Sequence, residues 1–178
     1  MSEMNTFTGR IFDPLKMMKQ DVCVEDIAHA LSLVCRGGGH IRYFFSVAQH
    51  SMNCASEAAA RGWSGRIVLA CLLHDASEAY MSDVPRPFKK YLKDYKKLED
   101  RLLSLVYEKY LGSDITEAEA RLVKQIDNDI LAYDLFYLLD EGCKEDLPEM
   151  KRPFSYEVRS FESVAQEYLE LFQKWMNK

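Results

Sequence analysis

Apolar residues recur at helical spacing along most of this 178-residue chain. Apolar positions at i, i+3, i+4 and i+7 are typical of a helix with one buried face. This pattern predicts helices over residues 24–35, 46–61, 64–80, 88–111, 116–142 and 156–176. Residues 1–20 lack the pattern and contain Gly9 and Pro14, so we expect an extended arm or a short hairpin there. The fold class predicted is therefore all-α, a bundle of about six helices.

Polar residues interrupt the apolar face of the helix predicted over 64–80. His74 and Asp75 follow a pair of leucines, and Glu78 lies four residues after His74, on the same face. Adjacent side chains diverge by about 100° on a helix, so both reach one point only beside the helix, as at a metal ion. The alternative interpretation is that His74 and Asp75 form the polar boundary of an ordinary amphipathic helix.

Two further helices place a polar residue on an apolar face. His50 lies one turn from Val47 and Cys54, and Asp127 lies between Val123 and Ile130. A lone His there is more commonly a hydrogen-bonded core residue, and a buried carboxylate is rarely unpaired. Asp134 repeats the placement of Asp127 seven residues later and is the rival candidate. Two imidazoles and two carboxylates would suit a divalent transition ion with positions open for water and substrate.

Composition limits the class of protein. Hydrophobic residues make up 48% of the chain and charged residues 29%, as in ordinary soluble domains, and the length suits one domain over 1–178. A formal net charge of −5 argues against a nucleic-acid groove. We expect a cytoplasmic protein without membrane contact, because no run approaches the roughly 20 apolar residues of a membrane span. The five cysteines show no CxxC spacing, and Cys54 and Cys71 are interpreted as core thiols.

A lysine-rich stretch and a glycine run have two interpretations each. The lysines follow Phe88, but Asp94, Glu99 and Asp100 offset their charge, which favours a solvated helix face over a nucleic-acid site. The lysines are Lys89, Lys90, Lys93, Lys96 and Lys97. The run 37–39 after Arg36 either ends a helix or lets backbone approach a ligand closely.

The order H…HD…D on a helical chain resembles the HD-domain metal-dependent phosphohydrolase superfamily. Three segments are similar to the branch that contains bacterial 5′-deoxynucleotidases and related phage-encoded hydrolases. They are FSVAQHS at 45–51, LLHDASEAYMSDVPRPFK at 72–89 and VKQIDNDILAYD at 123–134. The resemblance covers residues 24–140, between an N-terminal arm over 1–23 and the C-terminal helix, and implies a single HD domain.

The resemblance implies a site for one divalent metal ion, which could be Mn, Co, Fe, Ni, Zn or Mg. Its ligands would be His50, His74, Asp75 and Asp127. Such a cation lowers the pKa of bound water toward about 7 and holds a phosphate oxygen. The resemblance also makes Glu78 the candidate general acid or base, and Asp83 a carboxylate that positions the metal ligands or the substrate.

Arg36 and Lys89 are the candidates for neutralising a substrate phosphate, although each could be an ordinary surface cation. The resembling deoxynucleotidases carry an aromatic residue directly after the arginine at the pocket entrance. This chain has glycines there, so His40 or Arg42 are the candidates to fill that place. Base and sugar selectivity stay open.

The function expected from the resemblance is release of phosphate from a small phosphorylated metabolite, a nucleoside or deoxynucleoside 5′-monophosphate first of all. One alternative is a nucleoside-triphosphate or alarmone hydrolase. Another is a binding or regulatory module that keeps the metal as a structural staple without turnover. The partner expected is a small phosphorylated substrate and no nucleic acid. A homodimer would be in keeping with the family, although ordinary core packing uses the same aromatic and Met residues.

Overall fold

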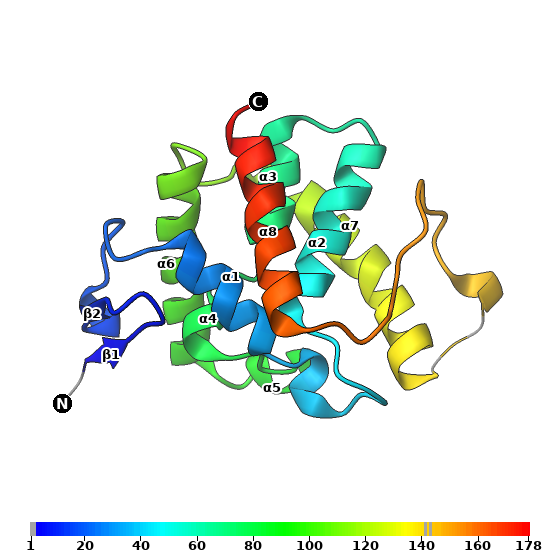
Figure 1. Ribbon diagram of the computed structural model, residues 1–178, viewed down its shortest axis with the longest axis horizontal. Coiled ribbons are helices and arrows are strands. Elements are labelled where there is room, and N and C mark those ends of the chain that lie inside the picture. Colours follow the sequence, from blue (N-terminus) through cyan, green and yellow to red (C-terminus); the bar gives the residue numbers. More distant parts are fainter. Residues whose placement is uncertain (1–2, 141, 143) are drawn as a thin grey trace.

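Helices dominate the computed structural model, which describes residues 3–140, 142 and 144–178 (Figure 1). Six of the described α-helices contain nine or more residues, which agrees with the predicted all-α bundle. They are α1 (Val24–Leu33), α2 (Val47–Ala60), α3 (Gly65–Leu73), α6 (Lys93–Tyr110), α7 (Glu117–Asp134) and α8 (Phe161–Met176). Two four-residue helices, α4 (Glu78–Met81) and α5 (Arg86–Lys89), lie between α3 and α6. None of the helices in the described part is both long and apolar enough to cross a bilayer.

The N-terminal segment forms the short hairpin that was one of the two predictions for it. Strands β1 (Met4–Asn5) and β2 (Ile11–Phe12) pair antiparallel at one end of the molecule (Figure 1). The segment is more than an arm, because Phe12, Met17 and Val22 are buried in the hydrophobic core.

One hydrophobic core receives side chains from the long helices. Helix α2 packs against α3 and α7, and α8 covers α1, α2 and α3 (Figure 1). Helix starts follow local capping: Ser46 and Thr116 open α2 and α7 with complete capping boxes, and the Ser64 and Ser160 side chains cap α3 and α8. Because α2, α3 and α7 contact one another, polar residues on their inner faces can meet.

The helix predicted over 64–80 is interrupted at residues 74–77. Helix α3 ends at Leu73, and a tight turn leads to α4. In this turn the Ala76 amide donates to the Leu73 carbonyl and the Glu78 amide to the Asp75 carbonyl, each across three residues. Such bonds tighten the last turn of a helix.

Three other predicted boundaries differ. The helix expected over 88–111 is divided into α5 and α6, because Leu92 leaves helical geometry with ψ 70°. Helix α7 passes into a π-helical turn, Leu135–Leu139, which ends at Asp140 in the left-handed region, so Gly142 is not the terminator. Helix α8 begins after Ser160, five residues later than predicted, because residues 156–160 are not helical.

Candidate metal centre

Two imidazoles from different helices present their Nε2 atoms to one point. His50 lies in the first turn of α2 and is fully buried, and His74 follows the last residue of α3. His50 Nδ1 lies 2.8 Å from Asp134 Oδ2, and His74 Nδ1 lies 2.8 Å from the Cys71 carbonyl oxygen. A carbonyl oxygen only accepts, so His74 Nδ1 carries a hydrogen and the neutral ring has its lone pair on Nε2. Both rings are therefore oriented as metal-binding imidazoles usually are.

Two carboxylates face the same Nε2 atoms. Asp127 Oδ1, from α7, lies 3.4 Å from His50 Nε2 and 3.8 Å from His74 Nε2. Asp75 Oδ2 lies 3.2 Å from His74 Nε2 and 3.9 Å from His50 Nε2. The other oxygen of Asp127, Oδ2, accepts from Arg86 at 2.5 Å and Lys124 at 2.9 Å. Asp127 thus has one oxygen held by cations and one directed at the imidazoles.

These four residues fit a divalent cation. Ligand atoms bound at about 2.0–2.2 Å in tetrahedral or octahedral geometry lie about 3.0–3.6 Å apart, close to the distances between these nitrogen and oxygen atoms. His74 Nε2 is buried and has no hydrogen-bond partner within the described part of the chain. The carboxylates of Asp75 and Asp127 face this atom, and a bound ion would balance their negative charge there. The predicted ligand set His50, His74, Asp75 and Asp127 is brought together at one point.

Cys54 adds a donor that the sequence interpretation assigned to the core. Its Sγ lies 3.6 Å from His50 Nε2, and donor atoms of Cys54, His50 and His74 lie within 4.8 Å of one another, so these three residues could also hold a metal ion. Cys54 is 1% exposed, and burial raises the pKa of its thiol well above the usual value. Its place one turn after His50 on α2 was the available sequence signal.

The electrostatics of the centre follow from burial and opposite charge. Burial lowers the pKa of His74, but the charges of Asp75 and Asp127 outweigh burial and raise that pKa to about 10. Burial raises the pKa of Asp127, yet its contacts with His50 and His74 hold it well below the usual range. A proton on His74 thus balances the carboxylates, and a bound cation would take over that role.

Asp134 and Arg36 connect the centre to its surroundings. Asp134 Oδ2 accepts from Arg36 at 3.1 Å as well as from His50, and Asp134 Oδ1 accepts from the Tyr156 hydroxyl at 3.1 Å. Asp134 is therefore not an alternative to Asp127 as a candidate metal ligand. It binds His50 at Nδ1, whereas Asp127 faces Nε2. Arg36 Nη1 also lies 3.7 Å from Asp75 and 4.0 Å from Asp83.

Asp83 fixes the glycine turn. Its Oδ2 accepts from the Gly37 amide at 2.9 Å, where Gly37 and Gly38 have positive φ values of 59° and 62°. Positive φ favours glycine, so the run 37–39 is needed for a sharp turn that presents Arg36. Asp83 thereby positions Arg36.

Buried Glu78 forms an ion pair with half-buried Lys89 beside the centre. Lys89 Nζ donates to Glu78 Oε1 at 2.9 Å and to Glu99 Oε1 at 2.6 Å, while Glu78 Oε2 is buried without a described partner. Burial raises the pKa of Glu78 to about 9, reinforced by Asp75 and Asp83 and opposed by Lys89. Lys89 is thus engaged with two carboxylates.

A pocket of about 880 Å³ opens onto the centre. Its lining contains two predicted metal ligands, Asp75 and Asp127, together with predicted catalytic and substrate-binding residues: Arg36, Glu78, Asp83 and Lys89. His40 and Arg42 do not line it; His40 is exposed and Arg42 pairs with Asp140. Aliphatic residues also line the pocket: Ile41, Val84, Leu131, Leu135, Leu138 and Leu139.

The chain is similar to two curated bacterial proteins, and no family model matches it. It is 40% identical over 110 residues to "Uncharacterized protein YfdR" of Escherichia coli K12, a match that covers 62% of this chain and 59% of that protein. It is 39% identical over 109 residues to "Uncharacterized protein RCAP_rcc00048" of Rhodobacter capsulatus, covering 58% and 55%. The chain thus spans little more than half the length of these relatives, whose names assign no activity.

Proposed function

We propose that this chain is an HD-type metal-dependent phosphohydrolase that releases phosphate from a nucleoside or deoxynucleoside 5′-monophosphate. The observation that carries the proposal is the convergence of His50, His74, Asp75 and Asp127 at a pocket that also contains Arg36. Two imidazoles and two carboxylates suit a first-row divalent ion. A bound ion would activate water and polarise a phosphate oxygen.

The chain's own residues have separate tasks in this proposal. Arg36, held in place by Asp134 and Asp83, neutralises charge on the phosphate. Glu78 exchanges a proton at Oε2, the oxygen that Lys89 leaves free. Hydrolysis breaks the bond between phosphorus and the ester oxygen, and water supplies the hydroxyl group of the released phosphate.

The experiment is phosphate release from ribo- and deoxyribonucleoside monophosphates, triphosphates and sugar phosphates. Chelated protein is supplemented separately with Mn, Co, Mg or Zn. We expect metal-dependent release from monophosphates and none from the His74→Ala variant. The proposal would be contradicted by full activity of a metal-depleted variant. It would also be contradicted if metal-loaded protein released no phosphate from any substrate of the panel.

A non-catalytic metal site is the second candidate, favoured by the contact between Cys54 and His50. A buried thiolate with imidazoles is typical of structural zinc. Asp75 and Asp127 line the pocket and Cys54 does not, which favours the catalytic proposal. Cobalt distinguishes the two: a sulfur-to-cobalt absorption band that Cys54→Ser abolishes would support the structural site.

A further inference from the structure

Lys89 has little capacity left for the substrate phosphate for which the sequence made it a candidate. A lysine ammonium has three N–H donors, and Lys89 Nζ gives two of them to Glu78 at 2.9 Å and Glu99 at 2.6 Å. Both carboxylates are buried, and the Lys89 side chain is only 21% exposed. Another cation of the pocket is therefore better suited to share the phosphate with Arg36.

Arg86, the first residue of α5, lines the same pocket and keeps most of its donors free. Its Nη1 donates to Asn128 Oδ1 at 3.0 Å, and its Nη2 donates to Asp127 Oδ2 at 2.5 Å. A guanidinium has five N–H groups, so three of them have no acceptor among the residues that the structure describes. The Arg86 side chain is 47% exposed, against 13% for Arg36, so these groups are open to a ligand in the pocket.

Each of the two candidate carboxylate ligands has one guanidinium beside it. Arg36 Nη1 lies 3.7 Å from Asp75 Oδ2, and Arg86 binds Asp127 at Oδ2. The other oxygen of Asp127, Oδ1, faces the two imidazoles at 3.4 and 3.8 Å. Because Arg86 and the imidazoles use different oxygens of Asp127, a cation at the centre and Arg86 can bind this carboxylate together.

The chain segments that carry the two arginines pack against each other. Gly38 lies two residues after Arg36, and a Cβ atom at Gly38 would lie 3.7 Å from Cγ of Pro85, the residue before Arg86. Asp83, two residues before Pro85, lies 4.0 Å from Arg36 Nη1. The two guanidiniums therefore enter the pocket from adjoining segments, and one ligand at the centre lies within reach of both.

We propose that Arg86 is a second phosphate-binding residue of the centre, which holds the substrate phosphate together with Arg36. This inference rests on the proposed function and gives to Arg86 the role that the sequence suggested for Lys89. The planar fork of a guanidinium matches the oxygens of a phosphate, and its contacts with Asp127 and Asn128 fix the plane of the fork before the substrate arrives.

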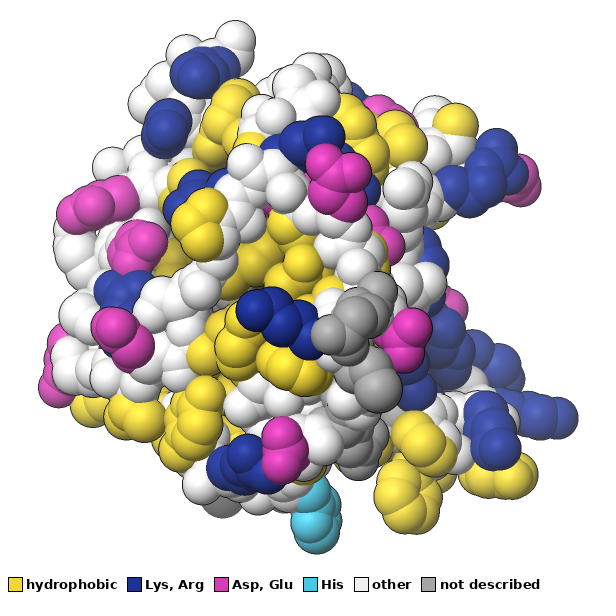
Figure 2. Space-filling view, turned by 90° about the vertical axis from the view of Figure 1, so that its right-hand side faces the viewer, with side chains coloured by type: hydrophobic (Ala, Val, Ile, Leu, Met, Phe, Trp, Pro, Cys, Tyr) yellow, Lys and Arg dark blue, Asp and Glu magenta, His cyan; other side chains and the backbone are white. Residues whose placement is uncertain are grey.

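The positive charge of the pocket as a whole is a competing explanation for phosphate binding. Eight cationic side chains line the pocket, and Figure 2 shows Lys and Arg side chains gathered at the lower right of one face. Such grouping raises the local concentration of anions without any direct contact. The test must therefore separate a contact made by Arg86 from the loss of one positive charge.

The test is calorimetry of inorganic phosphate binding to Co-saturated protein, with Arg86→Gln compared with Lys124→Gln. Both variants remove one pocket-lining cation that donates to Asp127 Oδ2. Arg86→Gln should raise the Kd for phosphate about tenfold to a hundredfold, because charge-assisted hydrogen bonds are lost. Lys124→Gln should raise it less than about threefold, because Lys124 is 56% exposed and acts as a single screened charge. Equal effects of the two variants would overturn the inference.

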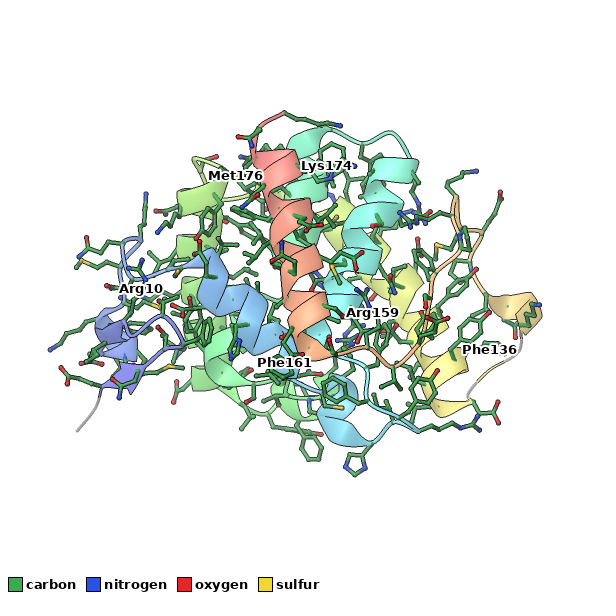
Figure 3. The ribbon with its side chains drawn as sticks, in the orientation of Figure 1. Arg10, Phe136, Arg159, Phe161, Lys174 and Met176 are labelled. Carbon is green, nitrogen blue, oxygen red and sulfur yellow. The ribbon has the colours of Figure 1, made fainter. Side chains whose placement is uncertain are left out.

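Two further variants complete the experiment. Figure 3 shows Lys174 near the C-terminal end of α8, at the end of the molecule opposite to α5, so Lys174→Gln should leave the Kd unchanged. Cobalt content is measured on every sample. If Arg86→Gln fails to retain Co, Arg86→Lys replaces it, because lysine keeps the charge beside Asp127 but lacks the fork. Weaker phosphate binding by Arg86→Lys would then support the inference, and wild-type affinity would overturn it.

Phosphate binding needs no turnover, so it separates this inference from the proposed function. If no phosphomonoester is cleaved with any metal, the proposed function fails. The role of Arg86 then stands if Arg86→Gln weakens phosphate binding and Lys124→Gln does not. It falls if the wild type does not bind phosphate, or if Arg86→Gln binds it as tightly as the wild type.

Discussion

At the scale of single residues, the centre depends on groups that orient the imidazoles as much as on the four predicted ligands. Asp134 is 4% exposed and holds His50 Nδ1, while Arg36 and Tyr156 hold Asp134. Carboxylates in this position fix the tautomer of a metal-binding imidazole and increase its basicity. Asp134 should therefore influence metal affinity without contacting the ion.

Replacing Asp134 by Asn should weaken metal binding by about 10–100-fold, because His50 loses a charged acceptor at Nδ1. Titration of chelated protein with Co or Mn measures the affinity. Asp129→Asn is the matched control on α7, since Asp129 pairs with Arg61 at 2.9 Å. Unchanged affinity in Asp134→Asn would mean that the position of His50 is fixed by packing alone.

Glu78→Gln should keep the metal and reduce turnover by about 10²–10⁴-fold, because the amide cannot exchange a proton at Oε2. Metal content and phosphate release are measured on the same preparation. Glu99→Gln is the matched control, since Glu99 is the other carboxylate bound by Lys89, and it should lose less activity. If the Glu78→Gln variant released phosphate at the wild-type rate, we would assign proton transfer to Asp83 instead.

At the scale of elements, the sequence predicted the starts of α1, α2, α3 and α7 to within one residue, but not those of α6 and α8. The helix predicted from residue 116 begins at Glu117, directly after the Thr116 cap. The break after Leu73 was not predicted, because residues 64–80 keep helical spacing throughout. The same limit applies to the site. Helical periodicity predicted that His50 and Asp127 point inward. It did not predict the contacts of Asp134 with His50 and of Arg86 with Asp127, which join residues far apart in the sequence, and Cys54 was interpreted as an ordinary core residue of its helix.

Glu119→Gln should destabilise the fold by up to about 1 kcal/mol near neutral pH, because Gln can still complete the capping box but loses the ion pair with Arg66. Hydrogen bonds from Arg66 and the Thr116 amide lower the pKa of Glu119 from 4.5 to about 2. A carboxylate with a depressed pKa stabilises the fold above its ordinary pKa, and this contribution is lost as pH falls from 4.5 toward 2. Urea unfolding at several pH values should show the difference from wild type shrinking in that window, with Glu117→Gln as the first-turn control.

At the scale of the whole molecule, the candidate centre joins helices that are separate in the sequence. His50 belongs to α2, His74 and Asp75 follow α3, and Asp127 belongs to α7. Without a cation, the buried carboxylates depend on protonated His74, Arg36 and Arg86 for compensation. An ion bound only by the folded chain stabilises it by mass action, and the stabilisation grows with the ratio of ion concentration to Kd.

Metal removal should therefore lower the melting temperature. At an ion concentration about 100 times Kd the stabilisation is about 2.7 kcal/mol, which corresponds to about 5–10 °C for a chain of this size. Calorimetry of chelated protein, with and without added Co or Mn, measures the shift. His74→Ala should show no metal-dependent shift, because it loses an Nε2 that has no other described partner. A metal-dependent shift of equal size in His74→Ala would place the ion elsewhere, and the three helices would then be held by packing and ion pairs alone.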